Sequence, residues 1–149
     1  MADIDWTPAL VEARLIEAAD TMKRLPPVKV QGYFNTWPVV RPEFADLVGR
    51  EPEQLRLGPP SAAAISRMDE ALEWLRWLDP EDAKLVWMRA EEKPWKVICR
   101  RFGVARSTAN RRWDYALNVI VWRLWGRPVP ATWSARFVAQ RVEFVSSEK

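Results

Sequence analysis

The residues best suited to chemistry in this sequence are arginines grouped around one glycine. The stretch RRFGVARSTANRRW, residues 100–113, holds five arginines and no acidic residue. Arginine can pair with phosphates or make bidentate contacts to guanine, and asparagine can do the same to adenine. A merely solvated helix face also carries arginines, so the surroundings of this stretch must decide between the two readings.

Charge is distributed unevenly along the 149 residues. Residues 1–78 contain 9 Lys/Arg and 12 Asp/Glu, whereas residues 79–149 contain 14 Lys/Arg and 8 Asp/Glu. Within residues 96–127 there are eight basic residues and a single acid, Asp114. A local excess of this kind is typical of a surface that binds a polyanion. The sequence therefore favours double-stranded DNA as a partner.

Apolar spacing around Gly103 predicts two helices joined by a tight turn. A first helix is expected over residues 95–102 and a longer one from Arg106 to about Trp125. Glycine reaches positive φ at little steric cost, and Cys99 is a small residue where the two helices would cross. The pattern indicates a helix-turn-helix.

The second helix of this pair is predicted to have two faces. The inward positions are Ala109, Trp113, Ala116 or Leu117, Ile120 and Leu124. The outward positions near its start, which we predict to contact DNA bases, are Arg106, Ser107, Asn110 and Arg111. The residues that we predict to contact DNA phosphates are Lys96, Arg100, Arg101, Thr108 and Arg112.

Residues 78–117 resemble region 4 of the bacterial sigma factors, especially the extracytoplasmic type. The residues that carry this resemblance are Trp95, Ile98, Cys99, Thr108, Ala116 and Leu117. Ala105 stands where that family usually has a capping serine or threonine, and Val97 stands where it usually has a glutamate. The resemblance implies a helix-turn-helix that binds DNA.

The whole chain also resembles an uncharacterised family of Trp-rich helix-turn-helix proteins from alphaproteobacterial genomes and their prophages. The stretches that carry this likeness are WTPALVEARL, RLPPVKVQGYFNTWP, SRMDEALEWLRWLDPEDAKLVWMRA and RFGVARSTANRRW. It too implies a DNA-binding role.

The elements that must position this motif are predicted to be helical, so the expected fold class is all-α. Thr7 and Pro8 predict a helix start, Ser61 predicts the cap of a later helix, and Asp79 with Pro80 predicts the start of the next. We expect an N-terminal helical lobe with a Pro-rich extended linker over residues 1–78. A DNA-binding domain over residues 79–127 and a tail over residues 128–149 follow.

Two segments are harder to assign. Residues 26–42 are rich in proline and read as an extended linker, before a short helix from Pro42 to about Val48. The tail after Pro130 fits either a last helix, with Trp133, Phe137 and Phe144 on one side, or a strand that pairs with the linker. The sequence does not decide between them.

The chain has ten tryptophans, which either fill a core or mark an interface. Those expected within amphipathic helices, and hence in helix packing, are Trp74, Trp77, Trp87, Trp95, Trp113 and Trp122. Trp6, Trp37 and Trp133 are expected to seal the N-terminal lobe onto the C-terminal one rather than to form an exposed patch.

Several classes of protein are disfavoured by what the sequence lacks. It has no histidine, one cysteine, no nucleophile–base pair and no phosphate-binding glycine loop, so we expect no catalytic residue, metal or cofactor and no enzyme activity. It also has no apolar run long enough to span a membrane and no basic secretory leader, which favours a cytoplasmic protein without a membrane partner.

These patterns predict sequence-specific binding of double-stranded DNA by a phage-related or host transcription regulator. Two alternatives stay open: a sigma-like co-regulator that binds RNA polymerase, and the DNA-recognition subunit of a viral small terminase. A homodimer stays open as well.

Overall fold

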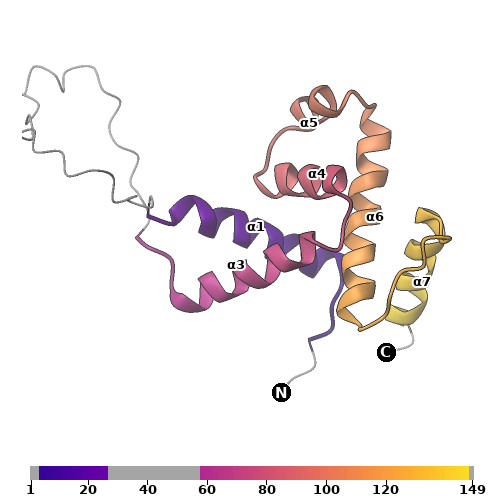
Figure 1. The fold of residues 1–149 in the computed structure, drawn as a ribbon, viewed down its shortest axis with the longest axis horizontal. Coiled ribbons are helices and arrows are strands. Elements are labelled where there is room, and N and C mark those ends of the chain that lie inside the picture. The colour runs from indigo at the N-terminus through magenta and orange to yellow at the C-terminus, as the bar shows by residue number, and fades with distance from the viewer. Residues whose placement is uncertain (1–3, 27–57, 148–149) are drawn as a thin grey trace, which may run out of the picture.

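The computed structural model describes residues 4–26 and 58–147, and within these ranges all regular structure is helical (Figure 1). The helices are α1 (Pro8–Arg24), α3 (Ala62–Leu75), α4 (Pro80–Ala90), α5 (Trp95–Phe102), α6 (Arg106–Leu124) and α7 (Ala135–Ser147). The all-α prediction is therefore confirmed. Three predictions fall on residues 27–57, outside the described residues. They concern the linker beyond Pro26, the short helix from Pro42 to about Val48, and Trp37.

Helix starts follow the polar residues that the sequence offers as caps. The Thr7 side-chain oxygen accepts a hydrogen bond of 3.2 Å from the Leu10 amide at the start of α1. Ser61 does the same for the Ala64 amide at the start of α3, also at 3.2 Å. Each such cap is worth about 1 kcal/mol. These two boundaries therefore lie where they were predicted.

Helix α6 is the central element of the fold. It contacts α1, α4, α5 and α7, and Figure 1 shows α4 and α5 beside its first turns and α7 along its later ones. Helices α1 and α3 pack on each other, and α1 also contacts α4. The arrangement leaves the start of α6 at one end of the molecule.

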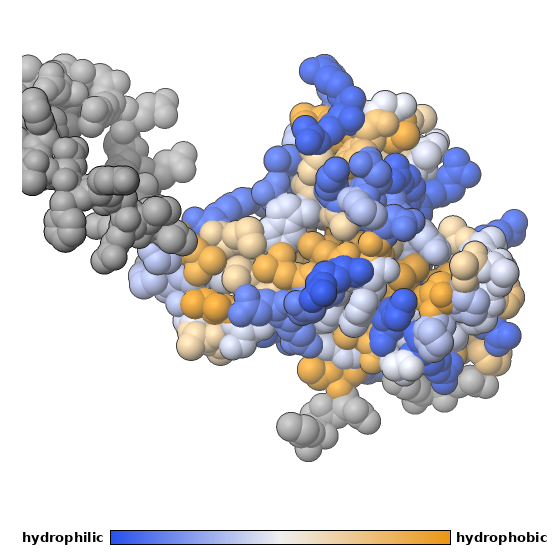
Figure 2. Space-filling view, in the orientation of Figure 1, coloured by the Kyte–Doolittle hydropathy of each residue, from blue (hydrophilic) through white to orange (hydrophobic). Residues whose placement is uncertain are grey.

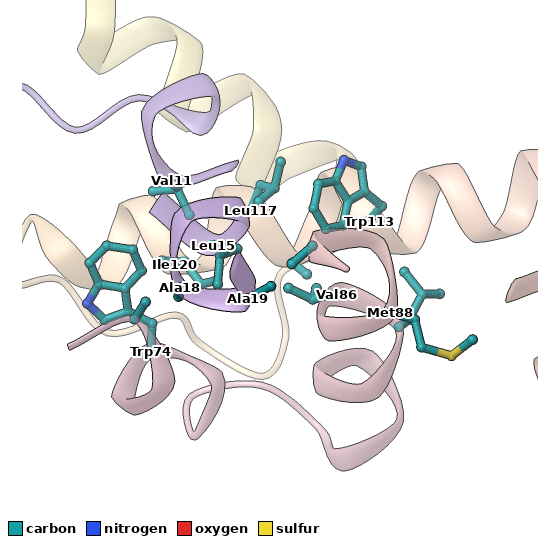
Figure 3. Packing of buried hydrophobic residues seen from close by; sticks show 14 of the residues in the cluster. Val11, Leu15, Ala18, Ala19, Trp74, Val86, Met88, Trp113, Leu117 and Ile120 are labelled. Atoms are coloured by element: carbon teal, nitrogen blue, oxygen red, sulfur yellow. The ribbon is translucent and has the colours of Figure 1, made fainter. Parts of the chain in front are cut away.

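One hydrophobic cluster joins these helices. Leu15 of α1, Trp74 of α3, Val86 of α4 and Ile120 of α6 all belong to it (Figure 3). Leu15, Val86 and Ile120 are completely buried, and burying a side chain of this size stabilises a fold by about 1.5–3 kcal/mol. The predicted N-terminal lobe and the predicted DNA-binding domain therefore share a core.

Most of the tryptophans take part in this packing. Trp74, Trp113 and Trp122 are buried, and the partly buried tryptophans packed against the cluster are Trp6, Trp77, Trp87, Trp95, Trp125 and Trp133. The Trp6 and Trp74 rings meet edge to face with centroids 5.1 Å apart. The packing role expected of Trp74, Trp77, Trp87, Trp95, Trp113 and Trp122 is confirmed. Trp6 and Trp133 also pack against the cluster, but their ring contacts lie within their own halves of the chain, so the sealing of the two lobes by these residues stays a prediction.

The tail forms a helix, so the strand alternative is excluded for residues 135–147. Its buried side consists of valines, because Val138 and Val142 are almost inaccessible to solvent. Phe144 is 55% exposed and Phe137 is 37% exposed. The Phe137 ring meets the Trp133 ring edge to face at 4.9 Å, beside the buried stripe and not within it.

None of the described helices is long and apolar enough to cross a membrane.

Candidate nucleic-acid interface

Helices α5 and α6 are joined by a turn centred on a left-handed glycine. Gly103 has φ 63° and ψ 31°, and the Val104 amide donates a 3.2 Å hydrogen bond to the Cys99 carbonyl. A Cβ at Gly103 would meet no atom within 4 Å, so the backbone conformation and not space favours glycine here. The turn lies where the sequence predicted it.

Buried side chains fix the second helix against its neighbours. On α6, Ala109 is completely buried and Trp113 is 6% exposed. On α5, Ile98 is completely buried as well. Helix α5 contacts both α4 and α6. The predicted inward positions Ala116, Leu117 and Ile120 are buried as well, so the inward face of α6 is confirmed.

The opposite face of α6 presents polar side chains to solvent near its start. Arg106, Ser107, Asn110 and Arg111 are all exposed. None of the four makes a side-chain hydrogen bond or an ion pair with any other residue in the described ranges. Their hydrogen-bonding groups are therefore available to a ligand.

The residues predicted to contact phosphates divide into three groups. Lys96, Arg100 and Arg101 of α5 are exposed and have no ion pair among the described residues, whereas Thr108 is half-buried. Figure 2 shows hydrophilic residues gathered over the part of this face where α4, α5 and the start of α6 lie. Arg112 forms the third group.

Arg112 is engaged inside the fold. Its Nη2 and Nε atoms lie 2.6 Å and 2.7 Å from Oδ1 of Asp82, whose side chain is only 14% exposed. The guanidinium also lies 5.7 Å from the centroid of the Phe102 ring. Arg112 therefore connects α6 to α4. Sequence reasoning missed Asp82 because no local pattern marks a pair 30 residues apart.

The backbone adds to the positive character of this region. The start of α6 has no acidic residue in its first turn, and Ala105 makes no side-chain cap. The free amide groups and the helix dipole at such an end favour an anion. Among the described residues no group of carboxylates and cysteines could hold a metal ion. The arrangement offers hydrogen-bond donors and positive charge at the start of α6.

Comparisons with known proteins relate the chain to a family of proteins. No curated protein and no solved structure matches the chain. A family model described as "Domain of unknown function (DUF6362)" matches residues 23–120, which include α3, α4, α5 and most of α6. The likeness to sigma region 4 stays a prediction. Because the match spans more than half of the chain, this protein belongs to the DUF6362 family.

Proposed function

We propose that this protein binds double-stranded DNA sequence-specifically, as a transcription regulator of a phage or its host, with the start of α6 in the major groove. One observation carries the proposal. Four donor-bearing or acceptor-bearing side chains lie exposed and without partners among the described residues, on the first turns of a helix whose other face is buried. The N-terminal end of the second helix is the part of a helix-turn-helix that contacts base edges.

The spacing of the four residues suits a groove. Arg106 and Asn110 are four apart, and so are Ser107 and Arg111, which makes two neighbouring rows on one helix face. From Arg106 to Arg111 the helix rises about 7.5 Å, on the order of two base-pair steps. Arginine suits guanine and asparagine suits adenine. One copy would thus read a short site.

Three cations of α5 would add affinity without selecting a sequence. Lys96, Arg100 and Arg101 are exposed on the helix that precedes the turn. Contacts to phosphates release counterions, so binding should weaken with salt with a logarithmic slope of about 0.9 per phosphate contacted. Arg112 contributes less to this set in the proposal, since Asp82 already holds its guanidinium.

The test starts with selection of bound sequences from a random duplex pool, followed by gel-shift titration of single variants. Arg106→Ala and Arg111→Ala should each weaken binding to the selected site by about 1–3 kcal/mol and relax specificity. Arg100→Ala should lower affinity for all sequences and reduce the salt slope.

Arg136→Ala provides the matched control, because Arg136 is an exposed arginine on α7 that lies outside the proposed face. It should leave the affinity for the selected site unchanged apart from a small general charge effect. Unchanged duplex binding by the Arg106, Arg111 and Arg100 variants together would refute the proposal.

A further inference from the structure

Helices α4 and α5 and the loop between them line an open groove of about 630 Å³, and none of the residues of α6 lines it. Trp87, Met88 and Val97 supply its apolar surface. Val97 is 47% exposed, which is unusual for a valine on a packed helix, and Trp87 is only half-buried. The groove therefore leaves apolar surface in contact with water, as binding sites for other proteins do.

Basic side chains surround this apolar surface. Lys84, Lys93 and Arg101 line the groove, whereas Glu91 is the one carboxylate that does so. Lys93 pairs with Glu91 at 2.8 Å, and Lys84 has a looser contact of 3.4 Å with Glu81. Arg101 has no ion pair among the described residues. The net charge of the lining is positive.

The lining residues come from one face of each helix. On α4 they are Ala83, Lys84, Trp87 and Met88, which recur at steps of one, three and one residues, and Glu91 follows as the C-cap of this helix. On α5 they are Val97 and Arg101, four residues apart. Two neighbouring helices thus present an apolar floor with cations beside it, which is the form of groove that accepts one face of a third helix.

We propose that this groove binds an acidic amphipathic helix of a partner protein. Apolar side chains of that helix would cover Trp87 and Val97, and its carboxylates would pair with Lys84 and Arg101. A nucleic-acid backbone fits less well, because its phosphates would pair with the cations of the groove but would leave the apolar surface of Trp87 and Val97 uncovered. The proposal does not depend on DNA binding by α6.

The experiment measures fluorescence anisotropy of a labelled synthetic peptide added to the full chain. The peptide carries leucines at helical spacing with glutamates between them, and a scrambled peptide of the same composition is the first control. The amphipathic peptide should bind, and the scrambled one should bind at least about tenfold more weakly, because scrambling disperses the apolar face. The Trp87 indole signal in a nitrogen–proton correlation spectrum should shift on binding.

Two variants locate the site. Val97→Gln removes apolar contact without changing charge and should weaken peptide binding about fivefold, while Lys84→Glu should weaken it in a salt-dependent manner. Phe144→Gln is the matched control, since Phe144 is an exposed apolar residue on α7. Circular dichroism would verify that each variant is folded.

Three outcomes would overturn the proposal. They are absence of binding by the amphipathic peptide, equal binding of the scrambled peptide, and an affinity that Val97→Gln leaves unchanged. If Arg106→Ala abolished peptide binding while Val97→Gln did not, the peptide would bind the α6 face instead. Because Val97→Gln should leave duplex binding intact, the result separates this proposal from the proposed function.

Discussion

The two halves of α6 differ sharply although they belong to one continuous helix. Residues 106–115 expose polar and basic side chains along one face, whereas the second half is enclosed. The buried residues of that second half are Ala116, Leu117, Val119, Ile120, Val121 and Trp122. A helix that is apolar nearly all round must be surrounded, and α1 and α7 both contact α6. One half is thus held so that the other half can present side chains.

The largest expected effect comes from truncating a buried side chain in the second half of α6. Ile120→Ala should lower the free energy of unfolding by about 2–5 kcal/mol, because Ile120 is completely buried and its truncation leaves a cavity. Urea denaturation followed by far-ultraviolet circular dichroism measures the loss. Asn110→Ala, on the exposed half of the same helix, should change stability by less than about 0.5 kcal/mol. Equal losses would show that the halves do not differ.

Arg112 lies at the boundary, and its neighbour offers a matched comparison. Arg112→Ala leaves the largely buried Asp82 carboxylate without its partner and should cost about 1–3 kcal/mol of stability. Arg111→Ala removes an exposed guanidinium with no ion pair among the described residues and should cost less than about 0.5 kcal/mol. The same denaturation experiment separates them, and a costly Arg111→Ala would contradict the proposed availability of that side chain.

The turn before α6 should be sensitive to backbone conformation alone. Gly103→Ala should destabilise the fold by about 1–2 kcal/mol, because alanine is strained at a φ of 63° while the space around the Cβ is open. Glu92 has the same kind of φ, 61°, so Glu92→Gly should raise the melting temperature. Calorimetry on both variants should show a lower melting temperature for Gly103→Ala and a higher one for Glu92→Gly. An unchanged melting temperature for Gly103→Ala would argue against this turn geometry.

The smallest expected effect concerns the link between α1 and α3 and depends on pH. Arg67 donates hydrogen bonds of 2.6 Å and 2.9 Å to Glu17 and thereby lowers the pKa of that carboxyl below its usual value of 4.5. A carboxyl with a lowered folded-state pKa adds stability at neutral pH that is lost as the pH falls through that pKa. Solvent screens this partly exposed pair, so the gain is small.

Glu17→Gln should therefore cost little stability at neutral pH and should lose less than the parent on acidification below about pH 4.5. Thermal melts across that range provide the comparison. Parallel pH profiles for the two proteins would show that the pair does not contribute.

Much of the fold follows from local signals in the sequence. Thr7, Ser61 and the Asp79–Pro80 pair mark helix starts because a cap or a proline acts within one turn. Gly103 marks the turn for the same reason, since its φ is a property of one residue. The inward face of α6 follows from helical periodicity.

The remaining features depend on contacts between distant residues. The tail was ambiguous because Val138 and Val142 become a buried stripe only when α6 lies beside them, and Phe137 and Phe144 suggested another side. The Arg112–Asp82 pair likewise requires α4 and α6 to meet. The exposure of the predicted base-contacting residues could be derived from the sequence, whereas their contacts to DNA stay a prediction.

The position of Cys99 provides a way to follow the motion of α5, the helix that precedes α6. It is the chain's single thiol, half-buried on α5, and its carbonyl closes the turn at Val104. Partial burial slows the reaction of this thiol with a reagent added to the native protein, so the labelling rate reports how exposed Cys99 becomes as α5 moves relative to its neighbours. If DNA binds α5, saturating duplex should slow the labelling of Cys99. The native thiol is enough for this measurement, so no engineered label is needed.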